Sequence, residues 1–279
     1  MRLTGPILGL SKEISPEQWV SAVKAMGFRA AYAPVKPETP DAEIESFAQI
    51  ALENDIVIPE VGAWSSPVAD DPKIRESGID KSKRSLELAE KLGARCCVNI
   101  SGSRGKEWAG PHPKNLTRET FDMIVEVVRD IIDSVQPTRT YYTLEAMPWM
   151  FPDSTESYAE LLEAIDRKSF AVHFDPVNLI YSPQRYYTNG ELIHEFVEKL
   201  GPHIKCCHAK DIRLSTTLTT HLDEVRPGLG ELDYRTFLRE VDRLDPDTPV
   251  VMEHLKSKEE YGEAAKHIRS FANDLGITT

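Results

Sequence analysis

Short apolar runs alternate with longer amphipathic segments along all 279 residues of the chain. This alternation predicts repeated βα units and a parallel sheet. The predicted strands are GPILGL (5–10), RAAYAP (29–34), DIVIPEV (55–61), RCCVNI (95–100), TYYTLEA (140–146), SFAVHFD (169–175), HIKCCH (203–208) and TPVVME (248–253). The predicted helices span residues 16–26, 40–54, 77–92, 117–135, 154–166, 188–200, 233–243 and 257–274. Eight strands and eight helices predict one (β/α)8 barrel domain over residues 1–279, with a doubly wound open sheet as the alternative.

Two long segments without a predicted helix follow predicted strands. They span residues 101–116 and 211–230. Loops of this length in a compact domain are usually functional lids or binding loops. Because both follow the carboxyl end of a strand, we expect both to lie over the active-site face of the barrel.

Composition and charge narrow the class of protein. Hydrophobic residues make up 41% of the chain and the net charge is −12, which is typical of a globular domain and argues against nucleic-acid binding. No apolar stretch reaches 18 residues and the N-terminus lacks a signal-peptide pattern, so neither a membrane span nor export is expected. Four cysteines form two adjacent pairs, Cys96–Cys97 and Cys206–Cys207, inside apolar runs. Without C-x-x-C spacing, they predict buried thiols in a reducing cytoplasm.

Four side chains of the kind that bind metals end four consecutive predicted strands. They are Glu145, Asp175, His208 and Glu253, separated by 30, 33 and 45 residues (175−145, 208−175 and 253−208). A strand, loop and helix need about 30 residues, so each candidate ends one βα unit. Alone, each has a plainer explanation as a solvated carboxylate or a core histidine. Because strand ends converge in a barrel, the four together predict one divalent metal ion with open positions.

The strings around these residues resemble a known family. "LEAMPW", "FDPVNL", "CHAKD", "MEH" and the later turn "RPGLGELDY" are similar to those of xylose isomerase-like TIM barrels, the sugar phosphate isomerase/epimerase superfamily. The resemblance covers most of the chain and implies a metal-dependent enzyme that acts on a carbohydrate. Mn²⁺, Mg²⁺ or Co²⁺ suits the oxygen and nitrogen ligand set, with Zn²⁺ as an alternative. Such families commonly form homodimers or homotetramers.

The resemblance also implies a mechanism. The metal would polarise the carbonyl of a small keto-sugar or polyol ketone, and Glu145 and Glu253 would be the acid/base pair acting through an enediolate. Asp175 and His208 would mainly hold the metal. Isomerisation or epimerisation is the first hypothesis. A lyase or dehydratase, of the inosose-dehydratase or keto-glycoside-eliminating kind, is the second. A barrel that keeps the ligands but only binds sugar or serves a structural role is the third.

A second set of residues is expected to contact the substrate. Lys210 shares the face of His208 and would contact a substrate oxygen or pair with Glu253. Arg226 would contact a hydroxyl or anionic group, unless it is a solvated loop arginine. His173 is either a partner of a metal ligand or a packed core histidine. The remaining candidates are Asn178, Glu60, Trp64 and Trp149.

The chain departs from two branches of the family it resembles. Asn178 stands where the apurinic endonucleases and the ketose 3-epimerases have a further histidine. Phe151 stands where the ketose 3-epimerases have a further glutamate. One metal rather than three is therefore expected. A more apolar pocket near Phe151 and Trp149 would admit a substituted or glycosylated keto-sugar, which keeps the lyase hypothesis open.

Overall fold

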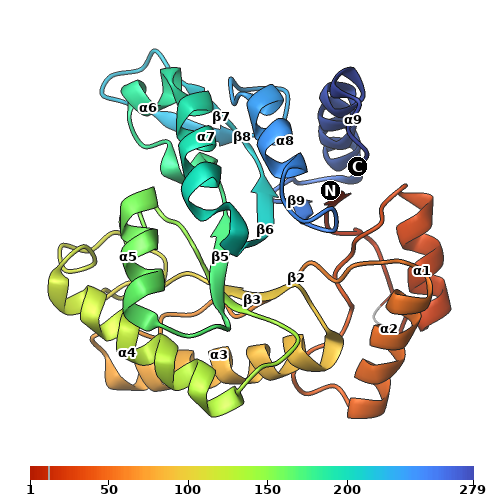
Figure 1. Cartoon of the computed structure of the whole chain (residues 1–279), viewed down its shortest axis with the longest axis horizontal. Coiled ribbons are helices and arrows are strands. Elements are labelled where there is room, and N and C mark those ends of the chain that lie inside the picture. Colours follow the sequence, from red (N-terminus) through yellow and green to blue (C-terminus); the bar gives the residue numbers. More distant parts are fainter. Residues whose placement is uncertain (12) are drawn as a thin grey trace. The chain divides into compact units, whose positions relative to one another are not determined.

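The structure, a computed structural model, describes residues 1–11 and 13–279. They form two compact units (Figure 1). Unit 1 comprises Met1–Pro34, Gln49–Pro59 and Phe174–Thr279, and unit 2 comprises Val35–Ala48 and Glu60–His173. Helix α2 (Asp41–Glu53) contains the division between Ala48 and Gln49. No helix among these described residues is both long and apolar enough to cross a membrane.

Unit 1 contains a parallel ladder and a hairpin. Its strands are β1 (Arg2–Thr4), β6 (Ile204–Ala209), β7 (Asp211–Leu214), β8 (Leu222–Val225) and β9 (Pro249–Met252). Strand β9 lies between β1 and β6 and runs parallel to both, whereas β7 pairs antiparallel with β8. In the β6–β9 pair, His208 is opposite Val251. The carboxyl ends of these two strands therefore lie side by side.

Helices cover the strands of unit 1. They are α1 (Pro16–Ala25), α6 (Pro183–Tyr187), α7 (Asn189–Leu200), α8 (Tyr234–Asp242) and α9 (Lys258–Leu275), with 3-10 turns η1 (Val177–Leu179) and η2 (Gly201–His203). Helix α7 packs against α8, and α8 against α9 (Figure 1). Phe174 stacks on Phe196 of α7 with ring centroids 4.3 Å apart. This aromatic contact joins the end of a strand to the helix layer.

Unit 2 is a run of βα repeats. Its elements are β2 (Glu60–Gly62), α3 (Pro72–Leu92), β3 (Cys96–Asn99), α4 (Arg118–Val135), β4 (Tyr142–Glu145), α5 (Thr155–Ile165) and β5 (Phe170–Phe174), whose last residue belongs to unit 1. Strands β2, β3, β4 and β5 pair in chain order, all parallel. Their residues are almost entirely buried because helices cover a parallel sheet. The predicted α/β class is thus confirmed.

Several element boundaries differ from those predicted from the amino-acid sequence. The first strand is Arg2–Thr4, not residues 5–10, because Pro6 has no N–H for a ladder bond. Residues 29–34 form only an isolated parallel bridge, from Ala30 to Val57. Helix α3 begins at Pro72, capped by Asp71, rather than at residue 77. Gly78 lies inside this helix, and because glycine is a poor helix former it made the true start hard to predict. Its lack of a side chain allows the backbone at Ser66–Pro67 to approach the helix closely. The segment 211–230 contains the β7–β8 hairpin, which was not predicted.

A buried tyrosine joins two parallel strands of unit 2. The Tyr158 hydroxyl contacts the carbonyl oxygen of Leu144 on β4 and also lies 3.2 Å from the carbonyl oxygen of Ala171 on β5. It accepts from the N–H of His173 at 3.1 Å. Burial raises the pKa of this hydroxyl well above its usual range, so it stays protonated and can donate. Tyr158 therefore positions the carboxyl ends of β4 and β5, where Glu145 lies.

Replacing Tyr158 with phenylalanine is expected to lower the free energy of unfolding by about 1–3 kcal/mol, because strand groups would lose a buried hydrogen-bond partner. Urea titration followed by circular dichroism measures the change as a lower midpoint at an unchanged slope. Tyr187→Phe is the matched control, since Tyr187 is 76% exposed. Equal midpoints for the two variants would show that the Tyr158 hydroxyl does not stabilise the sheet.

Candidate metal centre

Three of the four predicted metal ligands lie together in unit 1. Asp175 directly follows β5, His208 is the fifth residue of β6, and Glu253 directly follows β9. Since His208 is opposite Val251, Glu253 projects from the same face one pleat further along. Their ligand atoms all lie within 4.8 Å of one another. The His208 Nδ1 atom is 2.9 Å from Glu253 Oε1 and 3.8 Å from Asp175 Oδ2.

The backbone after β5 holds Asp175 in place. Its Oδ1 atom accepts from the N–H of Val177 at 2.9 Å and from the N–H of Asn178 at 3.3 Å. Pro176 has no N–H, so the carboxylate reaches past it to the start of η1. With Oδ1 held by these two N–H groups, the other oxygen, Oδ2, lies on the side of His208. Asn178 contacts the Asp175 carboxylate through its backbone N–H.

A buried lysine completes the charge balance of this cluster. Lys210, 2% exposed, lies one residue beyond β6 on the face of His208. Its Nζ atom is 2.6 Å from Glu253 Oε1 and 2.7 Å from Asp175 Oδ2. Burial acts to raise the pKa of the Glu253 carboxyl, but His208 and Lys210 outweigh it and lower that pKa to about 2. Glu253 is therefore ionised throughout the neutral range.

The carboxylate of Asp211 organises the loop that follows the hairpin. Its two oxygens accept from four backbone N–H groups at 2.9–3.0 Å, those of Ile212, Gly228, Gly230 and Leu232. A side chain at Gly230 would collide with Asp211 and with the backbone of Ile212, so only glycine fits there. This loop carries Arg226, half-buried, whose Nη1 atom donates to the carbonyl oxygen of Pro227 at 3.0 Å.

The hairpin also brings an acid to the cluster. Glu224 on β8 is 3.6 Å from Lys210 Nζ through its Oε2 atom. Its Oε1 atom is 2.9 Å from the Nδ1 atom of His254, and this hydrogen bond raises the pKa of the imidazole against the effect of burial. His254 has a φ of +59°, in the left-handed region, so the chain turns sharply directly after Glu253. Neither Glu224 nor His254 is among the site residues predicted from the sequence, although His254 directly follows the predicted ligand Glu253.

The remaining predicted site residues lie in unit 2. Glu145 ends β4, is 5% exposed, and is opposite His173 in the β4–β5 register. His173 is fully buried, and its Nε2 atom is 2.8 Å from Glu60 Oε2, an internal pair at the start of β2. Trp64 folds its indole over Gly62, and Trp149 donates from Nε1 to the carbonyl oxygen of Ala109 at 2.8 Å. The latter bond ties the loop after β4 to the long segment 101–116.

The residues of the unit 1 cluster fit a divalent cation. Two carboxylates and an imidazole with ligand atoms within 4.8 Å form the oxygen and nitrogen set that Mg²⁺, Mn²⁺ and related ions accept. Asp175 and His208 are fully buried, and the Glu253 side chain is 14% exposed. Glu253 is therefore the member of this set that is accessible from solvent.

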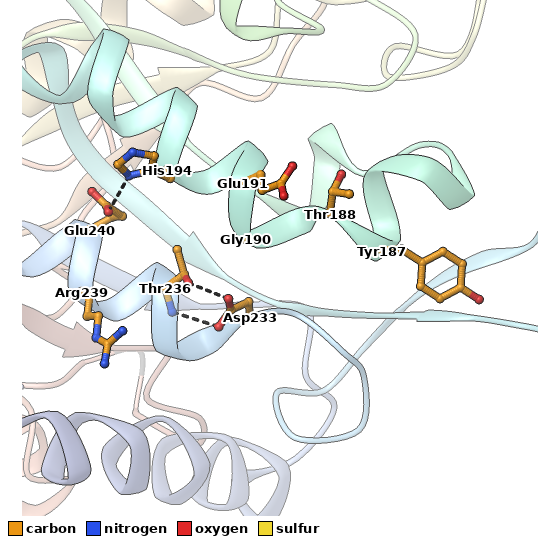
Figure 2. A pocket seen from close by; sticks show the side chains of 9 residues that line it. All are labelled: Tyr187, Thr188, Gly190, Glu191, His194, Asp233, Thr236, Arg239 and Glu240. Carbon is orange, nitrogen blue, oxygen red and sulfur yellow. Dashed lines mark hydrogen bonds and ion pairs between the residues drawn. The ribbon is translucent and has the colours of Figure 1, made fainter.

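A separate pocket of about 520 Å³ lies between α6–α7 and α8 in unit 1 (Figure 2). His194 hydrogen-bonds with Glu240 there at 2.9 Å, and Asp233 accepts from the N–H and hydroxyl of Thr236 at 3.0 and 2.6 Å. Asp233 is thus the N-cap of α8. The pocket contains none of the predicted site residues, and these polar groups serve to hold α7 and α8.

Residues 20–271 match the family described as the xylose isomerase-like TIM barrel, and the chain belongs to that family. The fold also matches solved structures over nearly the whole chain. A xylose isomerase-like TIM barrel protein from Mycobacterium smegmatis, in complex with magnesium, has a TM-score of 0.68 and 16% identity, covering 98% of this chain and 96% of its own. The predicted family and fold are confirmed.

Two further solved structures with the same fold are an epimerase and a probable dehydratase. D-psicose 3-epimerase from Clostridium cellulolyticum H10, with D-tagatose, has a TM-score of 0.68 and 16% identity, covering 100% of both chains. The probable 3-DHS dehydratase AsbF from Bacillus anthracis has a TM-score of 0.67 and 16% identity, covering 97% of this chain and 98% of its own. No curated protein matches the amino-acid sequence. At these identities the likeness establishes the fold.

His208→Ala is expected to abolish stable binding of a divalent cation, because it removes the only nitrogen ligand of the set. Elemental analysis after loading with Mn²⁺ and gel filtration measures this as a fall from about one ion per chain to less than a tenth of that. His203→Ala is the control, since the exposed His203 lies at the other end of β6. Equal metal content in the two variants would exclude His208 as a ligand.

Proposed function

We propose that this protein is a divalent-metal-dependent isomerase or epimerase that acts on a small keto-sugar or polyol ketone. The observation that carries the proposal is the cluster of Asp175, His208 and Glu253 at strand ends, in a chain of this family. Active sites of TIM barrels lie at the carboxyl ends of the strands. The epimerase with the same fold supports the reaction class, and the magnesium complex supports a divalent ion.

Glu253 is our candidate for one member of the acid/base pair. A bound cation would supply Lewis-acid polarisation of the substrate carbonyl. Glu253 is ionised at neutral pH, as its lowered pKa requires, and its carboxylate is partly exposed, so it can accept a proton from the carbon next to that carbonyl. Loss of that proton gives an enediolate, and its return to the same carbon or the neighbouring one decides between epimerisation and isomerisation.

Glu145 is our candidate for the other member of the pair and for the fourth ligand. This assignment rests on its position in the sequence, as the last residue of β4, one βα unit before Asp175. Its burial means that it would act only on a substrate enclosed in the site. Asn178 lies in η1 after β5, Lys210 directly follows β6, and Arg226 directly follows β8. We propose all three as contacts to substrate oxygens.

Glu253→Gln and Glu145→Gln should each reduce proton exchange at the substrate α-carbon by about 100-fold or more, because each removes a general acid/base. The measurement is NMR of a keto-sugar panel, including D-psicose and D-tagatose, incubated with Mn²⁺-loaded enzyme in deuterated water. Glu163→Gln, at an exposed position of α5, is the control.

Full exchange in either glutamine variant would contradict its acid/base role. No exchange by the wild type on any keto-sugar of the panel would instead favour a sugar-binding or structural barrel. The first result would concern the role of one glutamate, whereas the second would concern whether the protein is an enzyme.

A lyase or dehydratase is the second candidate function. The dehydratase with the same fold supports it, as does Phe151, whose ring packs edge-on against Phe121 with centroids 5.5 Å apart. An aromatic residue at this position favours a substrate with an apolar or substituted part. Mass spectrometry of the products separates the two functions: an isomerase conserves the substrate mass, whereas a dehydratase lowers it by the mass of one water.

A further inference from the structure

Lys210 and a divalent cation would need the same two oxygen atoms. Lys210 Nζ lies 2.6 Å from Glu253 Oε1 and 2.7 Å from Asp175 Oδ2. These two oxygens also lie 2.9 and 3.8 Å from the Nδ1 atom of His208. The ammonium therefore lies where the ligand atoms converge. A cation bound to these oxygens would meet the positive charge of Lys210 at close range, which is strongly unfavourable in a buried site.

A third carboxylate offers the ammonium another partner. Glu224 Oε2 on β8 is 3.6 Å from Lys210 Nζ, on the hairpin that begins one residue after the lysine. The backbone of Lys210 is fixed, since its carbonyl oxygen accepts from the buried Tyr234 hydroxyl at 2.6 Å. Only the flexible side chain needs to rotate to exchange one carboxylate contact for another. His254 holds Glu224 in position at 2.9 Å.

We propose that Lys210 is a built-in counter-ion of the metal centre that moves to Glu224 when a divalent cation binds Asp175 and Glu253. The ammonium neutralises the two carboxylates before the cation arrives, and it competes with the cation for them. Glu224 is the receiving carboxylate and makes the displacement less costly. This inference rests on the proposed metal site, and it assigns Glu224 as a positioning residue that acts through Lys210.

Two opposite effects on cation affinity follow. Lys210→Met should bind Mn²⁺ at least about tenfold more tightly, because the competing charge is gone. Its cation-stripped form should unfold at a lower temperature, because Asp175 and Glu253 are then left close together without a counter-charge. Glu224→Gln should bind Mn²⁺ about three- to tenfold more weakly, because the displaced ammonium loses its charged partner.

A double-mutant cycle gives the sharpest test. In the Lys210→Met background, Glu224→Gln should leave the Mn²⁺ affinity nearly unchanged, because Glu224 acts only through the lysine. Isothermal titration calorimetry of the stripped proteins measures the four dissociation constants, and differential scanning calorimetry measures their unfolding temperatures. Lys205→Met is the control: it removes one positive charge from the same strand, about 16 Å from Lys210 by strand geometry.

The possible outcomes separate the counter-ion role, the role of Glu224 and the metal site itself. Wild-type binding of Mn²⁺ with no gain in Lys210→Met would overturn the counter-ion role while leaving the proposed metal site intact. An undiminished Glu224→Gln effect in the Lys210→Met background would overturn the role of Glu224. Absence of Mn²⁺ binding by the wild type would overturn the metal site and the inference together. Should Lys210→Met fail to fold, Lys210→Gln keeps a hydrogen-bonding side chain without the charge and is expected to show the same gain in affinity.

Discussion

The close approach of two carboxylates, Asp175 fully buried and Glu253 partly exposed, is the constraint on which the candidate site depends. Asp175 and Glu253 both lie near the Nδ1 atom of His208, at 3.8 and 2.9 Å. Like charges in a buried site repel strongly, and leaving water costs each of them further. A positive partner is therefore required. Lys210 supplies it in this structure, and in a metal-dependent enzyme of the proposed kind a divalent cation would supply it more strongly.

The surrounding backbone converts this electrostatic requirement into a defined geometry. Backbone N–H groups direct one oxygen of Asp175, so the other is directed at the cluster. The Asp211 carboxylate gathers four backbone N–H groups from the hairpin and the loop after it. Tyr158 joins β4 to β5 in unit 2. Each device uses a buried polar side chain that hydrogen-bonds to backbone groups, and such bonds favour one conformation over several.

Loops decide the chemistry on this fold, because the barrel strands only bring side chains to one face. The similarity to an epimerase and to a dehydratase reflects a shared scaffold at 16% identity. In this chain the segments after the strands carry Phe151 and Trp149 beyond β4, and the β7–β8 hairpin with Glu224 beyond β6. We therefore expect substrate selection to reside in these segments rather than in the ligand residues.

The amino-acid sequence by itself determined the α/β class, the family, most element positions and three residues that cluster as candidate ligands. Strand and helix periodicity and strand-end positions are local signals. The predictions from sequence were wrong where the local signal was ambiguous. Gly78 inside α3 concealed the true start of that helix, and the short β7–β8 hairpin was not predicted. Only the tertiary structure decided the partners of Lys210, the pairing of His173 with Glu60, and the contacts of Glu224. Those pairings join residues on different strands and loops. The distances between these side chains are set by packing and charge in the folded protein. The spacing of the residues along the chain does not encode them.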